Sequence, residues 1–384
     1  MNMICKKTAL AMAFFLLFGL LSASADDWMG RLPDEAYVCQ LSIPGSHDAG
    51  TGHGFTGWMG NLGGDSYART QDKTISEQWE SGIRAFDFRP CVDGNTLRIN
   101  HGIIQTKLTL EDALATLCNL LDQHPTEAAI VLIRHETEGD DNSSEWNSKM
   151  VALLARDDVK SHAVNFTSAL RLSQLRGKLL ILSRDEYASS PTGGFIRNWS
   201  HSSVFADQKK STIVGRNTAT CYIQDFYEVT AAGAKDVKRQ SILTLLDYTS
   251  KRTRSSRLWA INHTSGYSLT ANLFGNTLST SDGYRDNAAT QHQAVIDFLA
   301  ENTGPTGIVM MDFAGVDRSG SYDVKGLALT QALIENNLRV YAGVGNPQED
   351  NDGTTEAYDL SGRHTESNRH GQVLIVNGKK VVRR

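Results

Sequence analysis

The chain has 384 residues, of which 40% are hydrophobic and 21% charged, enough for one large globular domain with a small appendage. Its formal net charge is −5, and removal of the two lysines in an N-terminal leader would make it −7. This acidic balance argues against a nucleic-acid-binding protein and against electrostatic attraction to an anionic membrane.

Residues 1–25 have the three parts of a secretory signal peptide. Lys6 and Lys7 form the charged region, residues 8–21 the apolar region, and Ala23-Ser24-Ala25 the cleavage site. The apolar run is too short to span a membrane comfortably, and no cysteine follows it as a lipid attachment point. We therefore expect an exported protein in the periplasm, on the cell surface or outside the cell.

Four cysteines remain after the leader, and none has the spacing of a metal site. They are Cys39, Cys91, Cys118 and Cys221. An exported protein can form disulfides, but Cys118 falls in a helical pattern and is expected in the core. The sequence leaves the pairing open.

The first strand pattern is the apolar run Tyr37–Ile43, which Pro44 and Gly45 are expected to end. Ser46, His47 and Asp48 follow, on a backbone that glycines at 50, 52 and 54 leave free to approach a ligand. A histidine here can move a proton near neutral pH, or it can simply cap a polar loop. The stretch alone leaves both interpretations open.

Residues 54–64 read GFTGWMGNLGG and predict a flexible glycine-rich loop beside His47. Trp58 and Met59 in this loop show no periodic pattern that would bury them. They are expected either to dock on a membrane or to pack against the body of the protein.

Thr74 and Glu77 have the spacing of a capping box for a short helix. The next strand pattern, Ile83–Arg89, carries Asp87 and Arg89 on one face. A surface salt bridge would explain such a pair, but the neighbouring residues are apolar, and buried charges need a reason.

Later strand patterns also end in polar residues. The run 97–102 ends at His101, Thr109 then caps a helix over 110–123, and the apolar run 128–136 predicts a buried parallel strand. The remaining strand patterns are 177–187, 220–229, 257–266, 307–315 and 338–343, with helical patterns at 236–248, 286–299 and 324–336.

This alternation predicts, for residues 26–345, an α/β fold: a (β/α)8 barrel of the TIM type, distorted or incompletely closed. An open doubly wound sheet is the alternative, but it would concentrate the chemistry at one switch point. Polar residues recur at the ends of about eight strands, which favours a ring with its site at the C-terminal rim.

The composition changes at residue 346. Residues 346–355 read as a polar linker, and residues 356–384 as a small β module with a hairpin at Asn377-Gly378. Through YDLSGR and GQVLIVNGKKV, this tail resembles the C-terminal sorting modules of secreted Bacteroidetes proteins.

The candidate catalytic residues are two histidines and an arginine, since no nucleophile elbow, P-loop or zinc motif is present. His47 and His101 can act as base and acid in an in-line phosphoryl transfer, while Arg89 neutralises the phosphoryl oxygens. Asp312 can orient the base and stabilise its cationic form.

The segments SIPGSHDAG, IRAFDFR, NHG and IVLIRHE, in this order, resemble the catalytic X domain of bacterial phosphatidylinositol-specific phospholipases C. The similarity continues more weakly through GKLLILSR, IQDFY, INHTS and VMMDF, and spans residues 37–316. The resemblance implies that His47 takes the proton of the inositol 2-hydroxyl and that His101, helped by Asp48, protonates the diacylglycerol oxygen. It also implies a phosphate clamp at Arg89 supported by Asp87, a base partner at Asp312, and head-group contacts at Arg134, Arg184, Asp225 and Tyr227.

Two departures from the family pattern are visible. Arg134 stands where a lysine is expected, a departure that concerns the head-group specificity and not the reaction. The segment after the first strand is rich in glycine. Physically, a hydroxyl-rich ring needs the fixed charges of Arg134, Glu136, Arg184 and Asp225, with Tyr227 over its apolar face. Taken individually, Glu136 and Asp48 are interpreted as rim salt bridges.

The sequence thus predicts a phospholipase C that converts phosphatidylinositol to diacylglycerol and 1,2-cyclic inositol phosphate, with glycosylated anchors as a further substrate. No cofactor or metal is expected, because Arg89 falls where related eukaryotic enzymes place a calcium-binding carboxylate. We expect a monomer that acts at a membrane surface and binds no nucleic acid. The alternatives are another barrel phosphodiesterase, such as a metal-dependent glycerophosphodiester hydrolase, and a catalytically silent head-group-binding module.

Overall fold

The computed structural model describes residues 27–140, 144–185, 193–199, 210–273 and 275–342, and three short C-terminal strands. The expected signal peptide (1–25) and linker (346–355) lie outside these residues. The chain divides into two compact units, Met1–Leu338 and Arg339–Arg384. Among the described helices, none is both long and apolar enough to cross a membrane.

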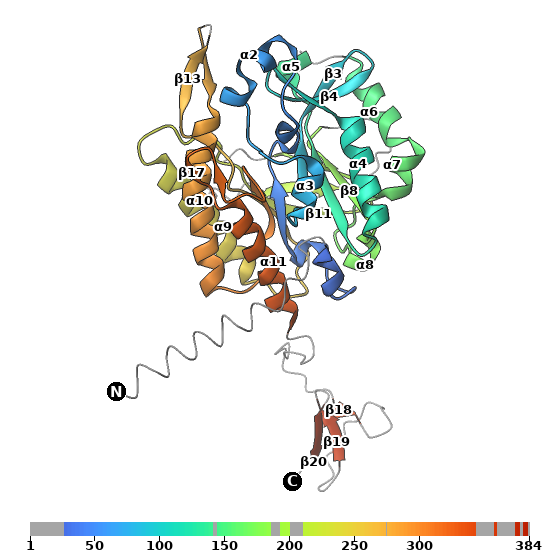
Figure 1. The fold of residues 1–384 in the computed structure, drawn as a ribbon. Coiled ribbons are helices and arrows are strands. Elements are labelled where there is room, and N and C mark those ends of the chain that lie inside the picture. The colour runs from blue at the N-terminus through green and yellow to red at the C-terminus, as the bar shows by residue number, and fades with distance from the viewer. Residues whose placement is uncertain are drawn as a thin grey trace, which may run out of the picture. The chain divides into compact units, whose positions relative to one another are not determined.

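Nine of the described strands close into a barrel, with α4 and α7 on one side of it and α9, α10 and α11 on the other (Figure 1). A parallel pairing of β6 with β8, from Ala128↔Lys178 to Ile133↔Ser183, closes the ring. The barrel is distorted because β10 runs antiparallel to both of its neighbours. In ring order the strands are β6 (Ala128–Ile133), β2 (Ala85–Phe88), β1 (Ser42–Ser46), β15 (Gly307–Met311), β12 (Trp259–His263), β11 (Thr218–Gln224), β10 (Lys210–Val214), β9 (Gly194–Arg197) and β8 (Lys178–Ser183).

The helices that the sequence predicts are present. Thr74 and Glu77 form the expected capping box, and the Thr109 side chain accepts a hydrogen bond from Asp112 N at 3.1 Å. The apolar face of α4 is buried in the core, and Cys118 lies there as expected. The four cysteines that follow the leader are free and buried. The described helices are α2 (Gly57–Tyr67), α3 (Ile75–Glu80), α4 (Leu110–Gln123), α5 (Thr137–Asp140), α6 (Trp146–Leu154), α7 (Asp157–His162), α8 (Leu172–Leu175), α9 (Ala234–Ser250), α10 (Ser281–Glu301) and α11 (Gly326–Ala342).

The first strand differs from the expected one: it runs from Ser42 to Ser46 and includes Pro44 and Gly45. Residues 38–40 before it form a 3-10 turn. Pro44 has no N–H to donate, but its carbonyl accepts from Arg84 N at 2.9 Å, so the strand keeps this bond to the segment before β2. Gly45 fits because it has no side chain: a Cβ there would lie 2.5 Å from Met310 Sδ. Proline and glycine here serve close packing between strands instead of ending one.

The expected loop over residues 54–64 is helix α2 in its larger part. Its glycines allow close packing: a Cβ on Gly64 would lie 2.3 Å from Cγ of Phe55. Met59 packs against the small cluster of Phe55, Ala68 and Ile104, whereas Trp58 is 69% exposed. The prediction of a flexible loop is therefore wrong.

The strand that ends at His101 does not belong to the barrel. It is β4 (Thr96–His101), the middle strand of an antiparallel sheet with β3 (Pro90–Asp93) and β5 (Ile104–Thr109). The connections are too short for a parallel crossover. They turn through Gly94 and Gly102, whose φ values of 56° and 57° suit tight hairpins.

Of the strand expected over residues 338–343, residues 338–342 instead form the last turn of α11, and residue 343 lies outside the described residues. Asn337 holds this helix against β1, since its Oδ1 accepts from Ser42 N and its Nδ2 donates to Ser42 O, both at 2.7 Å. Strands β9 and β10, which the sequence did not predict, supply the remaining part of the ring.

Short strand pairs complete the description. β7 (Ala163–Val164) pairs with β8, and hairpins form from β13 (Thr270–Leu273) with β14 (Asn276–Ser279) and from β16 (Arg318–Ser319) with β17 (Tyr322–Asp323). The C-terminal unit has a sheet of β18 (Ala357–Tyr358), β19 (Val373–Val376) and β20 (Lys379–Val382). Val376 pairs with Lys379, as a hairpin at 377–378 requires, and the turn itself lies outside the described residues.

Candidate active site

The candidate residues gather at the end of the barrel where the parallel strands terminate. Most of them end or directly follow a barrel strand, and His101 joins them from the antiparallel sheet. They are His47 after β1, Asp87 in β2 and Arg89 after it, Arg134 after β6, Arg184 after β8, Asp225 and Tyr227 after β11, and Asp312 after β15.

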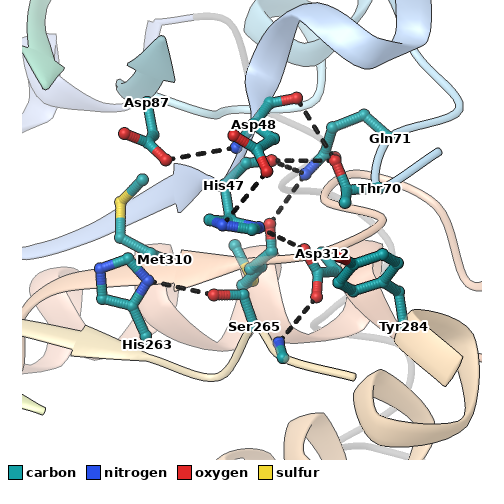
Figure 2. A network of polar contacts seen from close by, with 12 residues as sticks. His47, Asp48, Thr70, Gln71, Asp87, His263, Ser265, Tyr284, Met310 and Asp312 are labelled. Carbon is teal, nitrogen blue, oxygen red and sulfur yellow. Dashed lines mark hydrogen bonds and ion pairs between the residues drawn. The ribbon is translucent and has the colours of Figure 1, made fainter. Parts of the chain in front are cut away.

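His47 is fully buried. Its ring lies between the carboxyl groups of Asp48 and Asp312 (Figure 2), and its contacts hold it in one tautomer. Its Nε2 lies 2.7 Å from Nη2 of Arg89, and its Nδ1 lies 2.8 Å from Oδ1 of Asp312. A guanidinium has only donors, so Nε2 must carry the lone pair and Nδ1 the proton. Burial, followed by the charge of Arg89, holds the pKa of His47 well below its usual value. The ring is therefore neutral, with the basic nitrogen facing Arg89.

Asp312 orients the ring of His47 through a contact with its Nδ1. One carboxylate oxygen accepts from His47, and the other accepts from Gly266 N at 3.0 Å. Burial raises the pKa of Asp312, and the Gly266 N–H opposes that shift by stabilising the carboxylate. This arrangement matches the expected partner of a general base.

Arg89 links the other charged groups. Its Nε lies 2.9 Å from Oδ1 of Asp48 and 3.3 Å from Oδ2 of Asp87, while Nη2 donates to His47. Asp87 and Arg89 thus form the pair that their spacing predicts, in a buried site instead of at the surface.

Asp48 lies between the two histidines. Its Oδ2 is 3.4 Å from Nε2 of His47 and 3.3 Å from Nε2 of His101, yet neither of its oxygens receives a well-aligned hydrogen bond from a described residue. Burial, with repulsion from Asp87, raises the pKa of Asp48 to about 7 although Arg89 opposes the shift. The backbone of Asp48 is left-handed, with φ at 44°. Such strain is found where a side chain must point in one particular direction.

Asp48 and Glu136 do not form salt bridges at an exposed rim: Asp48 pairs with Arg89 inside the site, and Glu136 is buried as well. Asp48 is 1% and Glu136 3% exposed, so both lie inside the site. Burial raises the pKa of Glu136, and Arg89 and Arg134 oppose the shift. The sequence interpretation failed because the antiparallel sheet packs against both positions, which strand patterns alone do not reveal: Glu136 N donates to Pro90 O of β3 at 2.9 Å, and β4 contacts the turn that follows Asp48.

The charged groups could also be read as ligands for a metal ion. His47, Asp48 and Asp87 each offer one ligand atom, and these atoms lie within 4.8 Å of one another. Arg89 contacts all three side chains, however, so its guanidinium fills the position of a cation. The donor set fits a divalent ion only if Arg89 moves away.

The four residues expected to bind the head group lie close to this cluster of charged residues. Arg134 and Arg184 border an open pocket of about 330 Å³ together with Trp199. Arg184 stacks on the Trp199 ring at 3.9 Å, and Trp199 Nε1 donates to Oδ2 of Asp225 at 2.7 Å. The ring of Tyr227 lies 5.4 Å from that of His47.

Several residues of the site escaped the sequence analysis. Gln71 Nε2 donates to the carbonyls of His47 and Met311, both at 2.8 Å, and so ties the loop after β1 to β15. Lys238 is fully buried in α9 and donates to the Phe226 carbonyl at 2.5 Å and the Ser265 carbonyl at 2.6 Å. Only Lys238 carried a signal, a charge within an amphipathic helix pattern.

Comparison with known proteins gives matches in sequence and in fold, although no family model matches. The chain is 30% identical over 166 residues to the 1-phosphatidylinositol phosphodiesterase of Listeria monocytogenes, an alignment of 43% of this chain and 50% of that protein. It is 22% identical over 319 residues to the protein of the same name from Staphylococcus aureus, covering 79% of this chain and 93% of that protein.

Two solved structures share the fold. The first is a phosphatidylinositol-specific phospholipase C variant from S. aureus, with a TM-score of 0.64 and 19% identity over 83% of this chain and 99% of the other. The second, from L. monocytogenes, has a TM-score of 0.58 and 23% identity over 82% of this chain and 99% of the other. Both likenesses agree with the barrel expected from the sequence.

Proposed function

We propose that this chain, a member of the phosphatidylinositol-specific phospholipase C family, cleaves phosphatidylinositol into diacylglycerol and 1,2-cyclic inositol phosphate. The observation that carries the proposal is the position of Asp48 between His47 and His101, with Arg89 in contact with both His47 and Asp48. A head-group-binding module needs no such pair of proton-transfer groups.

The reaction needs one base, one acid and a clamp for the phosphoryl oxygens. Nε2 of His47 takes the proton of the inositol 2-hydroxyl, whose oxygen forms a bond to phosphorus. The bond from phosphorus to the glycerol oxygen breaks, and that oxygen receives a proton from His101, directly or through Asp48. One proton is taken and one is given, so the site returns to its starting charge after the two histidines exchange a proton with solvent.

Arg89 changes partners during this cycle. Without substrate its Nη2 donates to the lone pair of His47 Nε2, which blocks the base. A phosphoryl group accepts two hydrogen bonds from the planar guanidinium and draws it away from the ring. Removing the nearby cation then raises the pKa of His47 at the moment when the base is needed.

The site works without a metal ion in this proposal. The support is that Arg89 contacts each of the three side chains that would hold one. Its charge also repels a divalent cation and supplies the positive charge that a phosphoryl transition state requires.

Arg134, Arg184, Asp225 and Tyr227 bind the inositol ring. Fixed charges suit the ring hydroxyls, and Tyr227 covers an apolar face. As far as the described residues define it, the pocket at Arg134 and Arg184 is open to solvent and has room for a ring substituent, so glycosylated anchors are a further substrate.

The enzyme acts as an exported monomer at a membrane surface. Exposed apolar side chains lie on segments near the candidate site: Trp58 and Leu62 on α2, which packs against β5 and α10; Ile103, two residues beyond His101; and Leu269, whose carbonyl accepts from Thr280 N just before α10. In Figure 1, α2 and the β13–β14 hairpin lie at the same end of the barrel. The sequence of the leader supports export, and that of the C-terminal unit supports a role in sorting.

Phosphorus NMR of the reaction with phosphatidylinositol tests the proposal. We expect the cyclic phosphate to form first, at the same rate with excess chelator as without it. An acyclic phosphate formed directly, or activity that chelation abolishes and calcium restores, would favour a metal-dependent glycerophosphodiester hydrolase. A lack of turnover would favour a silent binding module.

A further inference from the structure

Lys238, in α9, is a buried cation that joins two loops of the candidate site. Its side chain is fully buried, and Nζ donates to the carbonyl of Phe226 at 2.5 Å and to that of Ser265 at 2.6 Å. Phe226 lies in the segment after β11, and Ser265 lies in the segment after β12. One side chain therefore holds together two loops at the end of the barrel that carries the site.

The carbonyl of Ser265 leads to the candidate base through one peptide group. The C=O of Ser265 and the N–H of Gly266 belong to the same planar unit. That N–H donates to Oδ2 of Asp312 at 3.0 Å, and Oδ1 of Asp312 accepts from Nδ1 of His47 at 2.8 Å. The ammonium of Lys238 is therefore linked to the base by one peptide group and one carboxylate.

The carbonyl of Phe226 belongs to the loop that carries Tyr227, and this loop lies against the other one. Tyr267 N donates to the Tyr227 carbonyl at 3.1 Å, and a Cβ at Gly266 would lie 2.4 Å from the same oxygen. The φ of Gly266 is 151°, a conformation that favours glycine. Close contact between the two loops thus depends on this glycine and on the two hydrogen bonds of Lys238.

The charge of Lys238 is held in place by its surroundings. Burial lowers the pKa of Lys238 to about 8, and the carboxylates of Asp225 and Asp312 oppose the shift, so the ammonium is charged at neutral pH. Two imidazoles also interact with Lys238, those of His263 and His292. Burial is the main cause that lowers the pKa of each to about 4, so both rings are neutral near pH 7.

Asp312 responds to the charge of Lys238. Burial raises the pKa of Asp312 and repulsion from Asp48 adds to the rise, whereas the Gly266 N–H, Lys238 and Arg89 oppose it. In the proposed reaction Arg89 turns toward the phosphoryl group, while Lys238 keeps its carbonyl partners. Lys238 is then the cation that continues to favour the ionised form of Asp312.

We propose that Lys238 is a positioning residue for the general base: its ammonium fixes and polarises the peptide group that follows Ser265, and this peptide holds the carboxylate of Asp312. A peptide whose oxygen accepts from a cation donates more strongly through its N–H. Asp312 therefore stays ionised and keeps the ring of His47 in place. The inference rests on the proposed function for its catalytic meaning.

Lys238→Met tests the proposal, because it removes the charge and keeps an unbranched side chain. The kcat on phosphatidylinositol at pH 7 should fall about 10- to 100-fold, less than the full contribution of a general base. The acidic limb of the pH profile should also move up by about one pH unit, since loss of a cation raises the pKa of both Asp312 and His47. A rate that is unchanged, or that falls equally at every pH, would overturn the proposal.

Two further variants separate the charge from packing. Leu245→Ala is the control: Leu245 is buried two turns further along α9, in a cluster with Tyr222 and Ala260. Its Tm should fall while the acidic limb stays in place, and a limb that moves as in Lys238→Met would contradict the proposal. Lys238→Gln keeps N–H donors without a charge. It serves where Lys238→Met does not fold, and it should shift the limb in the same direction.

Proton NMR of the Gly266 amide provides a readout that needs no substrate. In the wild-type protein its shift should change in a step near pH 8, as Lys238 loses its proton, and variants without the lysine should lack this step. A wild-type amide without the step, or a step that persists in the variants, would overturn the proposal. If the wild-type protein forms no cyclic phosphate, the proposed function fails, but the amide still decides whether Lys238 polarises this peptide.

Discussion

Single residues decide the proton chemistry of this site, and the two histidines are not equivalent. His47 is neutral with its basic Nε2 held by Arg89, whereas His101 contacts the carboxylate of Asp48 and the hydroxyl of Tyr284. His101 is also the more accessible of the two, with a side chain 14% exposed. A buried base and a partly exposed acid suit a hydroxyl within the pocket and a leaving group that remains with the lipid.

Replacing either histidine by alanine should reveal this difference. His47→Ala and His101→Ala should each lower kcat by about two to four orders of magnitude while the protein stays folded. A nitrophenol leaving group should partly restore the rate of His101→Ala alone, since that substrate does not need the acid. Rates measured with both substrates, and circular dichroism of each variant, check this. Equal restoration of both variants would mean that the roles are wrongly assigned.

Asp48 should make the protein less stable as the pH rises. Its pKa is about 7 in the folded state against 3.8 for the free group, so between these values the folded state holds a proton that the unfolded state has lost. Stability then falls from about pH 4 to about pH 7 and levels off above, because the unfolded state binds fewer protons in this window. Asp48→Asn, which has no charge to bury, should lose less stability across the window.

Thermal unfolding of both proteins from pH 4 to pH 8 measures this effect. The Tm of Asp48→Asn relative to the wild type should increase with pH, although the variant loses the carboxylate beside the acid. A difference in Tm that stays constant with pH would show that Asp48 is ionised throughout.

At the scale of elements, close contacts between strands bring the site residues together. Strand β1 carries His47, and its Gly45 packs against Met310 of β15, the strand that precedes Asp312. The distance between the base and its partner therefore depends on how closely these two strands approach each other.

Gly45→Ala tests this dependence. Its Cβ would lie 2.5 Å from Met310 Sδ and 3.1 Å from Ala85 Cβ, so we expect a loss of about 1–3 kcal/mol in the free energy of unfolding. Met310→Ala alone should also destabilise, but the double variant should be more stable than the sum of the single effects predicts. Urea unfolding of the four proteins gives this coupling, and simple additivity would show that the two side chains do not meet.

At the scale of the whole molecule, the end of the barrel that carries the site also exposes apolar side chains. Of the six tryptophans in the chain, Trp28, Trp79, Trp146 and Trp259 are buried and Trp58 is the most exposed. Its fluorescence thus reports on the surroundings of α2.

Addition of phosphatidylinositol vesicles should shift the tryptophan fluorescence to shorter wavelength if α2 enters the lipid surface. Trp58→Ala should abolish the shift and slow hydrolysis of vesicles more than of soluble monomeric substrate. Tyr248→Ala is the matched control. It removes an exposed aromatic side chain near the C-terminal end of α9 and should neither abolish the shift nor slow hydrolysis of vesicles selectively. If Trp58→Ala leaves the ratio of the two rates unchanged, docking through this residue is excluded.

Because the chain divides into two compact units, we expect that the C-terminal unit can be removed without loss of stability or activity on soluble substrate. A protein that ends after Ala342 keeps all of α11, including Asn337, which bonds to both backbone groups of Ser42. Its Tm and its rate on soluble substrate should match those of the full chain. A protein that ends at residue 336 should lose several degrees in Tm, since Ser42 N and O lose their partners. A drop in Tm for the longer protein would show that the C-terminal unit supports the barrel.

The sequence by itself determined the barrel class, the capped helices and the residues that gather in the candidate site. These features depend on local patterns: an apolar run with a polar end predicts both a buried strand and a side chain at its rim. His47, Arg89 and Asp312 follow barrel strands, and His47 contacts both of the others. The sequence predicted the contact with Asp312, but not the one with Arg89.

Only the tertiary structure decided the arrangements that join distant segments. It placed His101 on a separate antiparallel sheet, folded the glycine-rich segment into α2, made residues 338–342 a helix end and added β9 and β10 to the ring. The burial of Asp48 and the contact of Tyr284 with His101 arise in the same way. A local pattern indicates that a side chain will be buried, but its hydrogen-bond partner depends on which segments the complete fold brings beside it.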